Sequence, residues 1–173
     1  MGLFVIMSEN RLFLNELNMP IRSGKGGYTP HEKGREGDSK TPLGTYHLRF
    51  GLYRADRLPV PPPTNPQNPL NFRALRPDDG WCDASNDPAY NRFIKLPYPA
   101  SHEALWREDG AYDILLVMSH NDSPPTQALG SAVFFHIAQS DDRETLGCIA
   151  LAPDDMVRLL PKLQQDMPIT IKA

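Results

Sequence analysis

One histidine and one cysteine near the end of the chain have the residue types and spacing of a nucleophilic site. A free cysteine titrates near pH ~8.5, so its thiol attacks a carbonyl at neutral pH only when a neighbour stabilises the thiolate or takes the proton. His136 lies in an apolar run that precedes Cys148. Gly147 can adopt backbone angles that bring peptide N–H groups close to a reacting carbonyl. We therefore predict Cys148 as the nucleophile, His136 as its base and Gly147 as part of the oxyanion site.

Two apolar segments are expected to position this pair. Residues 131–138 (SAVFFHIA) are rich in β-branched and aromatic side chains, which favours a strand, and alternation puts His136 on the same face as Phe134. Residues 112–118 (YDILLVM) form a near-continuous apolar run, typical of a central strand buried on both faces. We expect the two strands to be neighbours.

Two competing nucleophiles are less favoured. Cys82 precedes an acidic residue, which raises a thiol pKa rather than lowering it, so inert packing is expected there. Ser119, His120 and Asp122 contain the residue types of a serine triad. Adjacent strand residues point in opposite directions, however, and no Gly-x-Ser-x-Gly elbow is present.

A metal site is a further alternative. His120, Asp122 and His136 would converge if their strands are neighbours, yet the chain has no His-Glu-x-x-His pattern and no paired Cys-x-x-Cys spacing. We therefore predict no metal and no cofactor. His120 is instead predicted to contact substrate near His136.

Length and composition indicate one ordinary globular domain. The chain has 173 residues, 40% of them hydrophobic, and a formal net charge of −3. We expect one catalytic domain over residues 1–173 and a monomeric protein. We expect it neither to bind nucleic acid nor to span a membrane. Two cysteines in a chain of this length do not make a disulfide framework.

Three segments together resemble a known family, the YkuD-type L,D-transpeptidase catalytic domain. After the histidine strand comes Thr-Leu-Gly-Cys-Ile at residues 145–149, which is similar to the family's Ser/Thr-x-Gly-Cys pattern. Upstream, GREGDSKTPLGTY at residues 34–46 resembles its Thr-Pro-x-Gly segment. Downstream, residues 152–163 and 167–173 match its final helix and strand. The resemblance covers roughly residues 20–173. The spacer between histidine and cysteine is shorter than usual, and Leu146 and Ala150 replace common polar residues.

The resemblance implies a fold and an activity. The fold would be mainly β, a sandwich or partly closed barrel with one helix near the C-terminus. A long Pro-rich insertion, residues 56–92, would form an ordered cap beside the cleft. The activity would be peptidoglycan L,D-transpeptidation of stem tetrapeptides or muropeptides through a thioester on Cys148. The same site could instead hydrolyse its substrate as a carboxypeptidase or endopeptidase, or the scaffold could be a non-catalytic binding module.

Several residues are predicted to contact the substrate in that cleft. They are His120, Thr145, Arg35 and Trp81. The N-terminal residues lack the basic segment and cleavage site of a secretory signal, whereas the family's substrate lies outside the cytoplasmic membrane. The compartment therefore stays open between the cell envelope and the cytoplasm.

Overall fold

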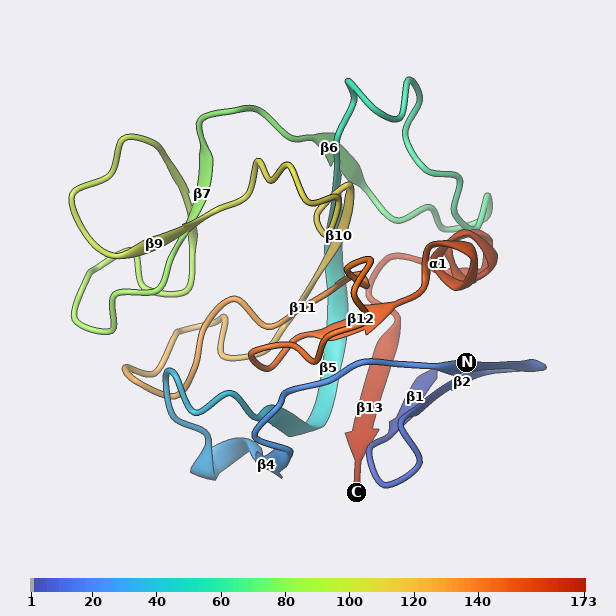
Figure 1. Cartoon of the computed structure of the whole chain (residues 1–173), viewed down its shortest axis with the longest axis horizontal. Coiled ribbons are helices and arrows are strands. Elements are labelled where there is room, and N and C mark those ends of the chain that lie inside the picture. The colour runs from blue at the N-terminus through green and yellow to red at the C-terminus, as the bar shows by residue number, and fades with distance from the viewer. Residues whose placement is uncertain (1) are drawn as a thin grey trace.

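The structure is a computed structural model that describes residues 2–173. It confirms the predicted fold class: mostly strands, one short α-helix within the described residues, and a nearly closed, barrel-like sheet (Figure 1). The main sheet contains β1 (Leu3–Ile6), β2 (Arg11–Leu14), β3 (Leu17–Pro20), β4 (Tyr28–Pro30), β5 (Thr41–Tyr53), β6 (Phe72–Ala74), β10 (Ile114–Met118), β11 (Phe134–Ile137), β12 (Ile149–Leu151) and β13 (Pro168–Lys172). A smaller sheet contains β7 (Asp79–Cys82), β8 (Phe93–Lys95) and β9 (His102–Ala104).

Strand β5 joins the two halves of the main sheet. It pairs antiparallel with β10 on one side and with β13 on the other, and runs through the centre of Figure 1. The order from edge to edge is β12-β11-β10-β5-β13-β1-β2-β3. Alternation in the sequence predicts a strand that begins at residue 45. Pairing with β4 and β13 extends β5 back to residue 41. The segment that resembles Thr-Pro-x-Gly is therefore part of the central strand.

The terminal elements follow local sequence rules. The turn-rich residues 8–10 between two apolar runs predict a hairpin, which is present as β1 and β2. Helix α1 (Pro153–Leu159) begins with proline at its first turn, where a missing N–H costs nothing, and has two aspartates near the positive end of its dipole. Pro161 lacks an N–H and clashes with the preceding turn, which predicts a stop or kink near residue 160, and α1 does pass there into the 3₁₀ helix η2 (Leu160–Lys162). A second 3₁₀ helix is η1 (His31–Lys33). No helix within residues 2–173 is long and apolar enough to cross a membrane.

Two hydrophobic clusters cover opposite faces of the sheet. Leu116 and Phe135 point into the first, together with Met156 and Leu159 of α1. Leu115 of β10 and Phe134 of β11 point into the second. Every residue of β10 is buried as a result, which confirms the sequence expectation for this strand.

The smaller sheet forms a cap over the second cluster. Trp81 of β7 packs edge-on against Phe134 of β11, with ring centroids 5.0 Å apart. The sequence SHEALW at residues 101–106 predicts one or two helical turns, which is wrong, because residues 102–104 form strand β9 and pair with β7. The partner strand satisfies the backbone groups that a short isolated helix would have left to water. The cap thus begins inside the predicted insertion and continues beyond it to residue 104.

The buried ring of Phe135 gives a test of this packing. Phe135 is 1% exposed in the first cluster, so Phe135→Ala should lower the free energy of unfolding by about 3–5 kcal/mol. Urea denaturation followed by circular dichroism measures this change. Val157→Ala, at a position 63% exposed, is the control and should stay within about 0.5 kcal/mol. Equal effects at the two positions would contradict the assigned core.

Candidate active site

The register of β11 and β12 puts the predicted nucleophile and base on one face of the sheet. The strands are parallel, with Phe135 opposite Ile149 and His136 opposite Ala150. Cys148, one residue earlier, therefore lies opposite Phe134. Paired residues of neighbouring strands share a face, and alternate residues of one strand do so too. Cys148 and His136 are thus on the face covered by the cap.

The thiol of Cys148 is held by the backbone of the neighbouring chain segment. Its Sγ accepts a hydrogen bond from the Phe134 N–H at 3.4 Å and donates one to the Ala132 carbonyl at 3.2 Å. These are its hydrogen bonds within residues 2–173, and His136 does not take part in them. The thiol has one proton, so a hydrogen bond from Sγ to His136 would replace the one to the Ala132 carbonyl. The catalytic pairing itself stays a prediction.

His136 is buried and held in one tautomer. Its Nδ1 lies 2.8 Å from the Ile137 carbonyl, which can only accept, so Nδ1 carries the proton and Nε2 has a free lone pair. Burial lowers the pKa of His136 to about 4, and the Ile137 bond offsets this only in part. The family resemblance implies that a carbonyl on the neighbouring strand fixes this tautomer, which is wrong, because the acceptor belongs to the next residue of the same strand. His136 is therefore neutral at pH 7 and suited to accept a proton at Nε2.

A cluster of charged and aromatic groups from the cap side of the molecule surrounds this pair. The Tyr112 ring packs edge-on against His136 at 5.3 Å, and its hydroxyl donates to Glu103 at 2.5 Å. Arg107 lies 3.6 Å from the same carboxylate. Sequence analysis missed Glu103, Arg107 and Tyr112, because only the folded cap brings β9 and the chain before β10 to the histidine.

This cluster acts on the nucleophile through charge. Burial, together with a smaller contribution from the Glu103 carboxylate, raises the pKa of the Cys148 thiol to about 12. The Phe134 N–H and the Arg107 guanidinium lower it. The resting group is therefore a neutral thiol, not a preformed thiolate.

The loop before the cysteine is fixed by two threonine hydroxyls. Thr41 of β5 donates to the Gly147 carbonyl at 3.0 Å and accepts from the Gly24 N–H at 2.9 Å. Thr145 accepts from the Gly147 N–H at 3.1 Å and donates to the Cys148 carbonyl at 2.6 Å. Thr145 thus shapes this loop with its hydroxyl, and the Gly147 N–H predicted for the oxyanion site is already bonded. The N–H of Cys148 has no acceptor in the part of the chain described, so it is the free donor next to the sulfur.

Gly147 itself is required by space and backbone angle. Its φ is 134°, which side chains disfavour, and a Cβ there would lie 2.9 Å from the Lys40 carbonyl oxygen. The segment before β5 therefore packs directly against the cysteine loop. This contact links the two sequence patterns that carried the family resemblance.

The other residues predicted to contact substrate are His120, Arg35 and Trp81, and they line two cavities. His120 is 4% exposed, packs against the His31 and Tyr46 rings, and has no hydrogen-bond partner for either ring nitrogen in residues 2–173. Burial lowers its pKa to about 4, with a further contribution from His31. Arg35 is exposed, donates to the Gly34 carbonyl at 2.6 Å, and lines a small cavity of about 40 Å³ that His120 also lines. Trp81 and His120 both line a larger cavity of about 670 Å³.

The competing sites do not assemble. Asp122 forms an ion pair with Arg49 at 2.7 Å, and the Ser119 hydroxyl accepts from the His47 N–H at 2.9 Å. Both side chains are therefore engaged away from a triad with His120. Cys82 and Cys148 are both free thiols.

The Thr41 hydroxyl gives a test of the loop. Thr41→Val keeps the shape but leaves the Gly24 N–H and the Gly147 carbonyl without partners, which should cost about 2 kcal/mol in the free energy of unfolding. Hydrogen exchange at Gly147 should become faster. Thr41→Ser keeps the hydroxyl and is the control, with a smaller loss. If both variants lose the same stability, the hydroxyl does not hold this loop.

Charge near the thiol gives a second test, read as the rate of iodoacetamide alkylation at pH 8 in a Cys82→Ala background. Glu103→Gln removes a negative charge that disfavours the thiolate, so the pKa of Cys148 should fall and alkylation should be about threefold to tenfold faster. Arg107→Gln should slow it. Glu108→Gln is the control, because that carboxylate pairs with Arg57 at 2.8 Å. Unchanged rates in both charge variants would show that the cluster does not act on Cys148.

Solved structures of other proteins align with this chain. Three solved structures each align with 99% of this chain. They are L,D-transpeptidase 1 of Mycobacterium tuberculosis (13% identity, TM-score 0.43, 60% of that chain), an L,D-transpeptidase from Mycobacterium smegmatis (14%, 0.41, 58%) and the helical cell shape determining protein Pgp2, a K307A mutant, from Campylobacter jejuni (15%, 0.44, 47%). The chain thus spans about half to three fifths of these proteins.

A search of the curated proteins found no match. The family comparison is more informative. The L,D-transpeptidase catalytic domain, YkuD, matches residues 3–171, which is nearly the whole sequence and includes both segments joined by the Thr41 hydroxyl. The chain therefore belongs to the YkuD family of L,D-transpeptidase catalytic domains.

Proposed function

We propose that this protein is a cysteine-dependent peptidoglycan L,D-transpeptidase that acts on stem tetrapeptides. One observation carries the proposal: Cys148 and His136 lie on one face of two adjacent parallel strands, with His136 held so that Nε2 is free to accept a proton. Family membership supports the reaction class. The domain would span residues 1–173, with the insertion at 56–92 as part of the cap beside the cleft.

The first half of the reaction transfers the acyl group to sulfur. The Cys148 thiol rotates toward His136 and gives its proton to Nε2 as Sγ attacks the carbonyl carbon of the third, L-centre residue. Because the resting thiol and imidazole are both neutral, the proton moves as the C–S bond forms. The free Cys148 N–H is placed to donate to the oxyanion. Collapse breaks the C–N bond, and the departing amine of D-alanine takes the proton from His136.

The second half of the reaction resolves the thioester. An amine of another stem peptide attacks the carbonyl carbon, His136 accepts its proton, and the sulfur leaves and is reprotonated. Water in place of the amine gives an L,D-carboxypeptidase or endopeptidase with the same machinery. Gly147 serves this site mainly by its backbone shape, and a Gly147 N–H released from Thr145 would add a second oxyanion donor.

Mass spectrometry tests the proposed reaction directly. Muropeptides incubated with the protein should give a covalent acyl adduct on Cys148 and cross-linked dimers, whereas tripeptide product alone would indicate hydrolysis. Cys148→Ala should lose adduct and product, with a rate reduction of at least about a thousandfold. Cys82→Ala is the matched control and should keep both.

A carbapenem, which acylates nucleophilic cysteines of this family, should give the same pattern of adducts. Binding of muropeptides that is equal in wild type and Cys148→Ala, with no adduct in either, would point instead to a non-catalytic binding module. Turnover that survives in Cys148→Ala would overturn the proposal.

A further inference from the structure

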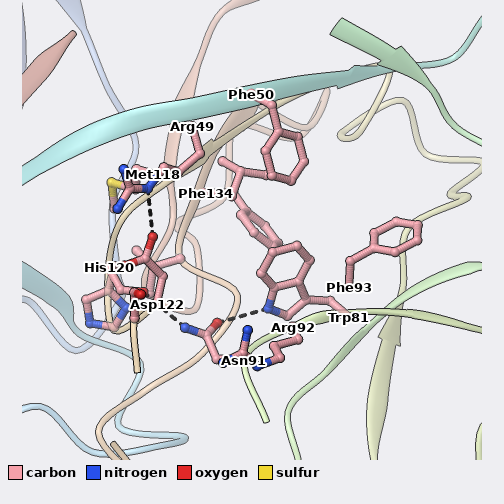
Figure 2. A pocket seen from close by; sticks show the side chains of 13 residues that line it. Arg49, Phe50, Trp81, Asn91, Arg92, Phe93, Met118, His120, Asp122 and Phe134 are labelled. Carbon is pink, nitrogen blue, oxygen red and sulfur yellow. Dashed lines mark hydrogen bonds and ion pairs between the residues drawn. The ribbon is translucent and has the colours of Figure 1, made fainter. Parts of the chain in front are cut away.

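We propose that the groove between the cap and the main sheet is a subsite for the carboxylate-bearing part of the acyl donor, upstream of the bond that is cleaved, and that Arg92 binds the carboxylate. This inference rests on the proposed function, and it names a part of the substrate and a residue that the catalytic pair does not require. Figure 2 shows the groove, with Phe50 and Arg49 on one side and Arg92, Phe93 and Trp81 on the other.

The groove has the size and walls of a ligand site. Its volume is about 670 Å³, within the usual range for pockets that bind small molecules or short peptides. Phe50, Val117 and Phe134 of the main sheet line it on one side, and Trp81 and Phe93 of the cap on the other. A ligand there would contact both the central strand and the insertion.

The groove lies on the same face of the sheet as the predicted nucleophile. Phe50 pairs with Val117, Val117 pairs with Phe134, and the Phe134 N–H reaches the sulfur of Cys148. All four side chains are therefore on one face of β5, β10, β11 and the start of β12. Strands lie about 4.8 Å apart, so the row extends about 14 Å from Cys148. An extended peptide rises about 3.4 Å per residue, so about four residues cover this length.

Arg92 is the free charged group of this groove. It is exposed, and its guanidinium has no hydrogen bond or ion pair with any residue from 2 to 173. Arg49 and Asp122, also in the groove, neutralise each other in an ion pair at 2.7 Å. A free guanidinium above an apolar floor is complementary to a carboxylate, which it can bind through two parallel hydrogen bonds.

The remaining polar groups disfavour a sugar as the occupant. Asn91 donates to the His120 and Asn121 carbonyls and accepts from the Trp81 indole and the Ala132 N–H, so its side chain is fully used. Trp81 and Phe134 are 7% and 1% exposed, which leaves neither ring face open for stacking on a sugar. An acidic peptide fits these walls better than a neutral glycan.

Calorimetric titration of the Cys148→Ala protein with a stem tetrapeptide tests the subsite without turnover. Adding Arg92→Ala should weaken binding about tenfold to a hundredfold, since a hydrogen bond to a charged group contributes about 1.5–3 kcal/mol. A peptide whose internal carboxylate is amidated should bind weakly and equally with or without Arg92. Arg92→Lys should restore part of the affinity. Arg76→Ala, at another exposed arginine of the insertion that does not line the groove, is the matched control and should bind as tightly as Cys148→Ala alone.

Turnover by the wild-type cysteine separates this inference from the proposed function. Arg92→Ala should raise KM for the tetrapeptide by a similar factor while kcat changes little, and alkylation of Cys148 should stay at the wild-type rate. If the acyl adduct forms but Arg92→Ala and amidation leave binding unchanged, the subsite is wrong and the enzyme stands. If no adduct forms but the Arg92 effect is present, the subsite stands on a binding module.

Discussion

The parallel pairing of β11 with β12 is the constraint on which the candidate site depends. This register puts Cys148 beside Phe134 and sets the sulfur against the backbone of residues 132–134. Strand β11 in turn pairs with β10, and β10 pairs with the central strand β5. A shift of one residue in any of these ladders would move Cys148 or His136 to the opposite face. The extended core is thus what fixes the geometry of two side chains.

The cysteine loop is held from the other end of the sequence. Thr41 at the start of β5 bonds the Gly147 carbonyl, and the Lys40 backbone leaves no room for a side chain at position 147. Two segments separated by about a hundred residues therefore form one unit, which explains why both carry the family pattern. Within the loop, the Thr145 hydroxyl accepts from the Gly147 N–H, so in the proposed oxyanion site one hydrogen bond must open before Gly147 can serve as a second donor.

The cap has two effects on the site. Through Glu103, Tyr112 and Arg107 it sets opposing charges near the sulfur and packs against His136. Through Trp81 and Phe93 it forms one wall of the groove on the same face of the sheet as the predicted nucleophile. Burial beneath the cap keeps both the thiol and the imidazole neutral at rest, so in the proposed reaction the two groups exchange a proton while substrate is bound. A neutral thiol reacts more slowly with oxidants and alkylating agents than a thiolate does.

The sequence by itself determined several of the elements and pointed to the two groups that are proposed to react. Alternation in residues 131–138 put His136 on the face of Phe134, the apolar run of β10 predicted burial on both faces, and Pro161 predicted the interruption after α1. Each of these follows from local periodicity or from one residue's backbone chemistry. Only the tertiary structure decided that residues 102–104 are a strand, that Glu103 and Tyr112 face the thiol, and that Thr145 holds Gly147. Periodicity fixes the face of a strand on which a side chain lies, whereas its neighbours on that face depend on register and packing between segments far apart in the chain.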